Sequence, residues 1–181
     1  SRTLVVTAGV LVAALLASLV HLSAQTAVTL SGALSPGAAQ PGIQVVNVTG
    51  SGFPSGTIAA ASVTVTLAPA AGGTSSTTTA TAIATVAGTS RRVSFVVPAT
   101  IAVTQPTGYS VRVSGSTAAG VQFVSANAAT LTVNPPPAIV STNPSSVLAG
   151  TSAAVTITTQ FTNFVQGATV ASFGPGVSVG G

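Results

Sequence analysis

Apolar and polar residues alternate in short runs along most of the chain, and Gly, Pro, Ser and Asn clusters separate the runs. A period of two is typical of a β-strand with one buried and one solvated face. The pattern predicts strands at residues 27–34, 43–49, 62–67, 79–86, 91–97, 109–114, 121–124 and 129–133. Seven or eight short strands in about a hundred residues indicate a β-sandwich. No segment after the N-terminal leader keeps the 3.6-residue period of a helix, so we expect essentially no helix there.

The pattern begins again after residues 134–137, whose sequence Asn-Pro-Pro-Pro predicts a stiff, extended link. Three residues recur at a single offset of 108, because Pro36, Gly42 and Phe53 return as Pro144, Gly150 and Phe161. A run rich in Val, Ile and Thr lies between the Gly and the Phe in both copies. We therefore expect a tandem repeat. The second copy is expected to be the start of a unit that continues beyond residue 181.

The N-terminal leader is an apolar run at residues 4–22, preceded by Arg2 and followed by small residues. This is the plan of a secretory signal peptide, with cleavage expected near Ala24 or Ala27. The run also approaches the length that crosses a bilayer, so a retained transmembrane or filament-core helix is the alternative. His21 lies inside the run and is interpreted as a tolerated leader residue.

Composition restricts the chemistry of the chain. It contains no Asp, no Glu and no Cys, its only histidine is His21, and charged residues make up 2%. Proton transfer, metal binding and covalent catalysis draw mainly on these missing residue types. We therefore predict that the chain is not an enzyme and has no catalytic, cofactor-binding or metal-binding residues. The net charge of +4 comes from four arginines, too few for a nucleic-acid interface.

Two segments resemble a known family. The sequence from Ala138 to Gly150, AIVSTNPSSVLAG, is followed by an alternating run and then by QFTNFVQGATVASFG. This resembles the opening of an IPT/TIG-type immunoglobulin-like domain, and VTGSGFPSGT at residues 48–57 is similar to the turn of such a domain. The resemblance implies low-charge repeats of large bacterial secreted or surface proteins. It implies no catalytic residue and does not identify a ligand.

The resulting expectation is an all-β chain of tandem immunoglobulin-like β-sandwiches after an N-terminal hydrophobic helix. The domains are a signal peptide or retained helix at 1–25, a sandwich at 26–134 (the first unit), a proline linker at 135–137, and the start of a second, incomplete sandwich at 138–181 (the second unit).

Individual residues give further expectations. Tyr109, the only tyrosine, is expected to form a tyrosine corner, with its ring in the core and its hydroxyl bonded to nearby backbone. Arg91 and Arg92 should point to opposite faces of a strand and reach solvent. Asn47 begins an N-glycosylation sequon inside a predicted strand, and residues 74–79 are expected to form a polar loop. Six aromatic residues are expected to be core anchors: Phe53, Phe95, Phe123, Phe161, Phe164 and Phe173.

These features predict a non-catalytic structural or adhesive module, secreted or on the cell surface. Its expected partners are other envelope proteins, a surface polysaccharide or further copies of itself in a filament. No nucleic acid is expected, and the membrane is involved only through residues 4–22 if they are retained. Two alternatives stay open: a pilin-like filament subunit with a retained N-terminal helix, and an immunoglobulin-like region attached to an enzyme beyond residue 181.

Overall fold

The computed structural model describes residues 25–162, 164 and 168–179. Both interpretations of the leader, together with Arg2 and His21, lie outside these residues. The described part of the chain contains no α-helix and one short 3-10 turn, Ala60–Ser62. The predicted all-β class is therefore confirmed for this part.

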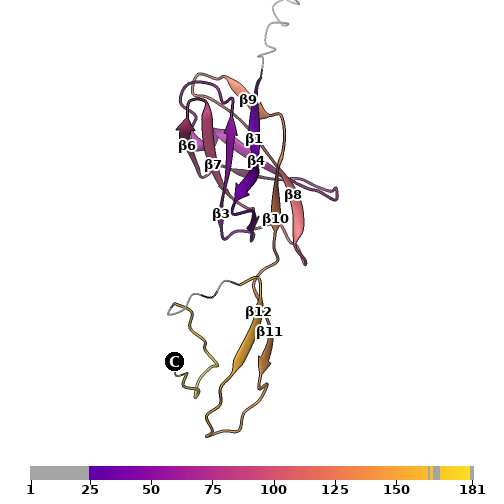
Figure 1. Ribbon diagram of the computed structural model, residues 1–181, viewed down its shortest axis with the longest axis vertical. Helices are drawn as coiled ribbons and strands as arrows, with labels where there is room; N and C mark the ends of the chain where they lie inside the picture. The colour runs from indigo at the N-terminus through magenta and orange to yellow at the C-terminus, as the bar shows by residue number, and fades with distance from the viewer. Residues whose placement is uncertain (1–24, 163, 165–167, 180–181) are drawn as a thin grey trace, which may run out of the picture.

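One layer of the first unit is an antiparallel sheet with the strand order β1-β3-β7-β6 (Figure 1). Val46 pairs with Phe95 and Val48 with Val93, so apolar residues of neighbouring strands share one face. The bounds are β1 Thr26–Ser35, β3 Val45–Ser51, β7 Ser90–Val96 and β6 Ala82–Ala87.

The other layer is built around β8, which pairs with β4 on one side and with β10 and β9 in succession on the other. Strand β5 extends this layer beyond β4, and the short β2 lies beside β10. The bounds are β2 Ala38–Ala39, β4 Val63–Pro69, β5 Ser76–Thr79, β8 Thr107–Ser116, β9 Gln122–Ser125 and β10 Ala129–Val133.

Strand β1 belongs to both layers. Its first residues, from Thr26 to Val28, run parallel to β9, and from Thr29 onward it pairs with β3. The chain then returns to the second layer, where Ala39 in β2 pairs with Val133 in β10. The edge of the second layer formed by β9 and β10 is therefore not open, because β1 pairs with β9 and β2 pairs with β10.

The core lies between the two layers. Alternate residues of each strand are buried, including Val63, Val65 and Leu67 on β4 and Val93 and Phe95 on β7. At one end, Phe53 and Phe123 meet edge to face with ring centroids 5.3 Å apart. Two sheets that share one apolar core are consistent with the predicted β-sandwich.

The outer face of the second layer carries rows of hydroxyl groups. Thr64 pairs with Thr79 on β5 and with Ser114 on β8. The next row includes Thr66 and ends at Arg112. These residues alternate with buried ones and therefore point away from the core. The polar groups of this face are mainly hydroxyls, and Arg112 is the single charged residue among these paired positions.

The prediction of one strand at 79–86 was wrong, because the chain changes layer within it. The amide of Ala80 donates to the carbonyl of Val63 in one layer, at 2.9 Å. The next amide, of Thr81, donates to the carbonyl of Ser94 in the other layer, at 2.8 Å. The segment therefore splits into β5 and β6. The loop predicted at residues 74–79 is also wrong from residue 76 onward, because Ser76–Thr79 pair with β4 as strand β5.

Side chains bridge the gap between β9 and β10, where the chain leaves the ladder. The Ser125 hydroxyl accepts a hydrogen bond from the buried amide of Val113 on β8, at 3.0 Å. On the other side, the Asn127 side chain accepts from the amide of Leu30 at 2.7 Å and donates to the carbonyl of Leu30 at 2.8 Å. The Asn127 amide thus replaces a backbone partner for β1.

In the second unit, β11 (Ala138–Asn143) and β12 (Thr156–Gln160) form an antiparallel pair. Beside the connecting segment their register repeats that of β1 and β3 with one extra residue between the strands, and the register shift farther along is smaller in the second pair. In the first unit the pairs are Leu34 with Val48 and Ser35 with Asn47; in the second they are Thr142 with Ile157 and Asn143 with Thr156. Gly42 and Gly150 both have positive φ, 73° and 80°.

Candidate functional site

The arginines do not gather into one cationic site. Arg91 and Arg92 lie on β7, whereas Arg112 lies on β8 in the other layer. Arg92 is exposed and Arg91 is partly buried, as expected for opposite faces. The Arg91 guanidinium donates to the carbonyl of Gly88 at 2.8 Å, and that of Arg112 to the carbonyl of Ser125 at 3.3 Å. Backbone carbonyls therefore take the place of carboxylate partners.

Tyr109 lies on β8 with its ring in the core and only 7% of its surface exposed. The predicted position of the ring is confirmed. In the described part of the chain, no hydrogen bond to the Tyr109 hydroxyl is formed, so the expected bond of a tyrosine corner is absent there. Tyr109 lies between β4 and β10 in the sheet, where it is paired with Pro69 and Leu131.

Asn47 lies in β3, as predicted, and its side chain takes part in the sheet. Its amide nitrogen donates to the carbonyl of Ser35 at 3.2 Å, and its oxygen accepts from the Ser94 hydroxyl at 2.7 Å. A glycan at this position would have to displace the first of these contacts. The Asn47 side chain therefore has a structural role in the sheet.

The expected core anchors divide between the two units. Phe53, Phe95 and Phe123 are fully buried in the first unit. In the second unit Phe161 is half-buried, and Phe164 and Phe173 are 55% and 43% exposed. The prediction was therefore wrong for Phe164 and Phe173. Both residues line a hollow on the second unit.

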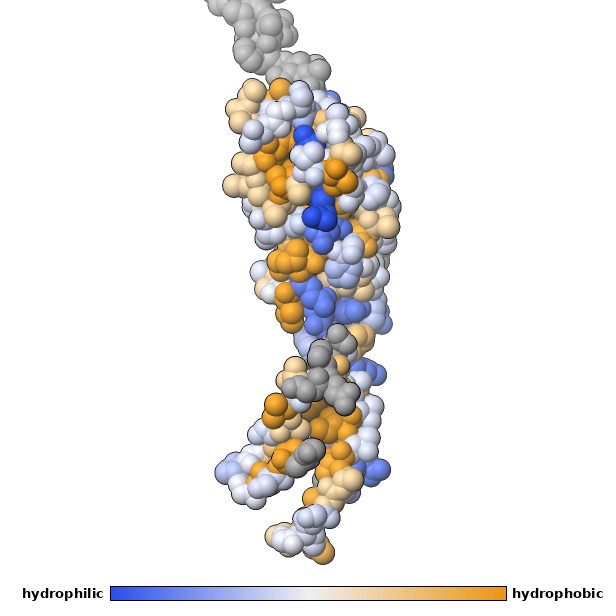
Figure 2. All heavy atoms as spheres, turned by 60° about the vertical axis from the view of Figure 1, so that its left-hand side comes forward, coloured by the Kyte–Doolittle hydropathy of each residue, from blue (hydrophilic) through white to orange (hydrophobic). Residues whose placement is uncertain are grey.

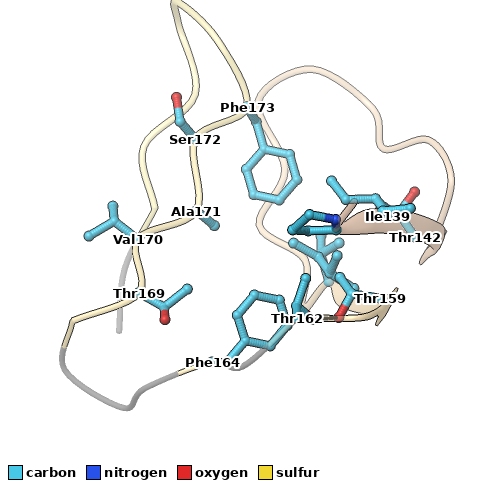
Figure 3. A pocket seen from close by; sticks show the side chains of 14 residues that line it. Ile139, Thr142, Thr159, Thr162, Phe164, Thr169, Val170, Ala171, Ser172 and Phe173 are labelled. Atoms are coloured by element: carbon cyan, nitrogen blue, oxygen red, sulfur yellow. Dashed lines mark hydrogen bonds between the residues drawn. The ribbon is translucent and has the colours of Figure 1, made fainter. Parts of the chain in front are cut away.

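This hollow, the apolar groove, is an open cavity of about 650 Å³ on the second unit. One wall is the face of β11 and β12 that carries Ile139 and Ile157, together with Val155 just before β12, and the other is the segment 169–173. Figure 3 shows Phe164 and Phe173 directed into the groove toward β11 and β12. In Figure 2, hydrophobic side chains gather along the inner sides of the lower part of the molecule.

The segment 169–173 presents alternate residues to the groove. In Figure 3, Ala171 and Phe173 point inward, whereas Val170 and Ser172 point away. Val170 is 87% exposed. A period of two is that of an extended strand, although the segment is not paired into a described sheet. The repeat could have revealed this site, because its offset of 108 places Ala171 and Phe173 at the positions of buried Val63 and Val65.

A glutamine holds the two units together. The side-chain nitrogen of Gln40, just after β2, donates to the carbonyl of Pro135 at 3.3 Å and to the carbonyl of Phe161. Pro135 is buried, so the linker packs against the first unit. One side chain thus connects the first unit, the linker and the second unit.

The residues that the structure describes contain no group of three or more His, Cys, Asp or Glu side chains that could hold a metal ion. Within the same residues there is no helix long and apolar enough to span a membrane.

Comparison with known proteins finds no matching protein-family model, no matching curated protein and no matching solved structure.

Proposed function

We propose that this chain is a non-catalytic structural or adhesive module of a secreted or cell-surface protein, built from tandem immunoglobulin-like repeats of bacterial type. The strand order carries the proposal. In an immunoglobulin-type sandwich, strands A, B, E and D form one sheet and C, F and G form the other. The first unit has β1, β3, β7 and β6 in one layer, and β4, β8 and β9 with β10 in the other. The seven positions correspond when β9 and β10 together stand for strand G, and β2 and β5 are additional strands.

The register of the second unit supports the tandem organisation. β11 and β12 pair antiparallel as β1 and β3 do, and each pair contains a register shift. Next to the connecting segment the two registers agree when β11 is related to β1 by 108 residues and β12 to β3 by 109. This agreement is stronger support than the three shared residues alone.

The absence of acid, thiol and imidazole side chains after residue 24 supports a role in binding or spacing. The many Ser and Thr hydroxyls would need a base to become nucleophiles, and a calcium site at the junction would need carboxylates. The contacts of Gln40 with Pro135 and Phe161 fix the joint between the units. A fixed joint suits a module that holds another region at a distance.

The proposal is tested by recovering the protein from cells and from their medium and determining its N-terminus. A surface or extracellular location with a start near residue 25 is expected. A start at or before residue 1 in an assembled fibre would favour the filament alternative. A purified chain from Gln25 to Gly181 should turn over no substrate in a broad hydrolase and transferase panel. Reproducible turnover would contradict the non-catalytic role.

A further inference from the structure

Strand β6 is the free edge of the first layer (Figure 1). It pairs with β7 on one side, and no strand of the described chain lies on its other side. The opposite end of this layer is not free, because β1 also pairs with β9. An edge strand keeps one row of backbone N–H and C=O groups without strand partners. The edge of β6 is therefore where the first layer can accept a further strand.

The sequence of β6 lacks the residues that usually protect such an edge. Its six residues are AIATVA, which include no charged residue and no proline. Ala82, Thr85, Val86 and Ala87 are exposed, and Val86 is 57% exposed. Small and β-branched side chains fit closely against a neighbouring strand. One register shift, between Thr85 and Ala87, disturbs only the last residues of β6. Most of the edge is thus open to strand addition.

An arginine beside this edge determines the charge of a suitable partner. Arg92 on β7 is paired with Ala84 of β6 and with Thr49 of β3, on the outer face of the layer. Arg92 is exposed, and its guanidinium forms no hydrogen bond among the described residues. The guanidinium groups of Arg91 and Arg112, in contrast, donate to backbone carbonyls. The sequence has no Asp or Glu, so a carboxylate side chain for Arg92 has to come from another molecule.

Arg92 lies within reach of a strand added at this edge. Neighbouring strands are about 4.8 Å apart, so an added strand would run roughly 10 Å from the backbone of β7. Only Ala84, with its single methyl group, lies between Arg92 and the added residue on the outer face. An arginine side chain can extend its apolar stem over such a small residue and keep its guanidinium in water. On the inner face, half-buried Ile83 packs against the core and offers an apolar contact to the same strand.

We propose that the edge of β6 binds an extended acidic segment of a partner protein by strand addition. A carboxylate of that segment, opposite Ala84, pairs with Arg92 on the outer face, and the apolar residues beside it cover Ile83 and Thr85 on the inner face. Backbone hydrogen bonds supply affinity, and the arginine favours negative charge. A second copy of this chain fits the edge less well, because it has no acidic residue and brings another Arg92 near the interface. The inference names a partner for the proposed structural or adhesive module and rests on that function.

The test titrates the chain from Gln25 to Gly181 with a short peptide of alternating Glu and Val residues. Control peptides of the same length carry Gln or Lys in place of every Glu. Backbone amide shifts and hydrogen exchange are measured by nuclear magnetic resonance, and light scattering gives the mass of the chain without peptide. The Glu peptide is expected to shift and protect amides within 82–87 and to leave those of β5 unchanged. It should bind about two- to fivefold more tightly than the Gln peptide, as expected for one exposed ion pair.

Three variants separate the edge and its arginine from other effects. Arg92→Gln should remove the preference for the Glu peptide over the Gln peptide. Arg112→Gln makes the same change of charge in the other layer and should retain the preference. Ala84→Glu places a carboxylate beside Arg92 and repels the Glu peptide, so this variant should prefer the Lys peptide.

Equal binding of the Glu and Gln peptides to the parent chain would overturn the proposal, and so would shifts confined to β5 or to the second unit. The absence of binding by any of the peptides would contradict strand addition at β6. A dimer of the chain with amides 82–87 protected before peptide is added would also overturn the proposal, since a second copy would then occupy the edge. These outcomes do not depend on the N-terminus, the cellular location or turnover, which test the proposed function.

Discussion

The face of β1 and β3 in the first unit is covered by a second layer, whereas the matching face of β11 and β12 lines an open groove. Both strand pairs are antiparallel with closely similar registers, and a glycine with positive φ lies in the connection of each pair. The difference shows that alternation and turn residues are sufficient to specify strand pairing locally. Burial requires strands that are distant in sequence, because apolar side chains on one sheet need an opposing sheet.

Truncating one aromatic residue in each unit gives the largest expected contrast. Phe123→Ala should lower the free energy of unfolding of the first unit by about 3–5 kcal/mol, because it leaves a cavity in a closed core. Phe173→Ala should change the same transition by less than about 0.5 kcal/mol, since its ring lies on the open groove. Chemical denaturation of the chain from Gln25 to Gly181 measures both. Equal losses would show that the two units unfold as one body.

The core of the first unit should also reject a single methyl group. A Cβ on Gly115 would lie 2.4 Å from the carbonyl oxygen of Ser62 and 2.9 Å from the Phe123 ring. Gly115→Ala should therefore cost about 1–3 kcal/mol through strain. Gly32→Ala is the control, because no atom lies within 4 Å of a Cβ there. A neutral result for Gly115→Ala in thermal denaturation would contradict the close packing of β8 against β4.

The side-chain bridge beside β9 can be removed separately. Asn127→Ala leaves the amide and the carbonyl of Leu30 without their partner, which should cost about 1–3 kcal/mol. Asn134→Ala is the matched control, because only its backbone forms a hydrogen bond in the described structure. Hydrogen exchange at Leu30 should rise in the first variant alone. Unchanged exchange would mean that water replaces the bridge at no cost.

Coupling between the units should depend on Gln40. Gln40→Ala removes the contacts with Pro135 and Phe161 and should cost about 0.5–1.5 kcal/mol of interface stability, with the first unit intact. Nuclear spin relaxation should then give separate rotational correlation times for the two units. Gln44→Ala changes the same junction without removing a side-chain hydrogen bond. Separate tumbling in the parent chain would contradict a fixed joint.

The smallest expected effect is shared by both units. From Gln25 onward the chain has no carboxylate, imidazole, thiol or lysine side chain. Folded and unfolded states then bind the same number of side-chain protons, so the slope of unfolding free energy against pH is about zero from about pH 5 to about pH 7. Urea denaturation across this range measures it. A slope of either sign would contradict equal proton binding by the folded and unfolded states.

Sequence pattern predicted most of the first unit because its strands alternate clearly, as in β4 and β8. The pattern did not predict the structure where neighbouring residues belong to different layers. Ala80 and Thr81 lie in one Thr/Ala/Val run, yet their amides bond to opposite sheets. The two-residue β2 is too short to show a period, and it forms because β10 lies beside it.

The candidate site was less accessible from sequence. Phe164 and Phe173 look like core residues by composition, and nothing local in the sequence shows that the described residues leave both side chains partly exposed. The offset of 108 relates Phe173 to Val65 and Ile157 to the region of Val48, but the extra residue before β12 becomes clear only from the register. The contacts of Gln40 join residues about a hundred positions apart and leave no periodic signal.

The hydroxyl rows on the outer face of β4, β5 and β8 determine how this surface responds to high salt concentration. Raising the ionic strength from 0.15 M to about 1 M shortens the distance over which charges act from about 8 Å to about 3 Å. A surface that owes its hydration to Thr64, Thr66 and Ser114 loses little by this change, because hydroxyl groups keep their bonds to water. The surface that this protein presents to neighbouring molecules should therefore be nearly the same in dilute and in concentrated salt.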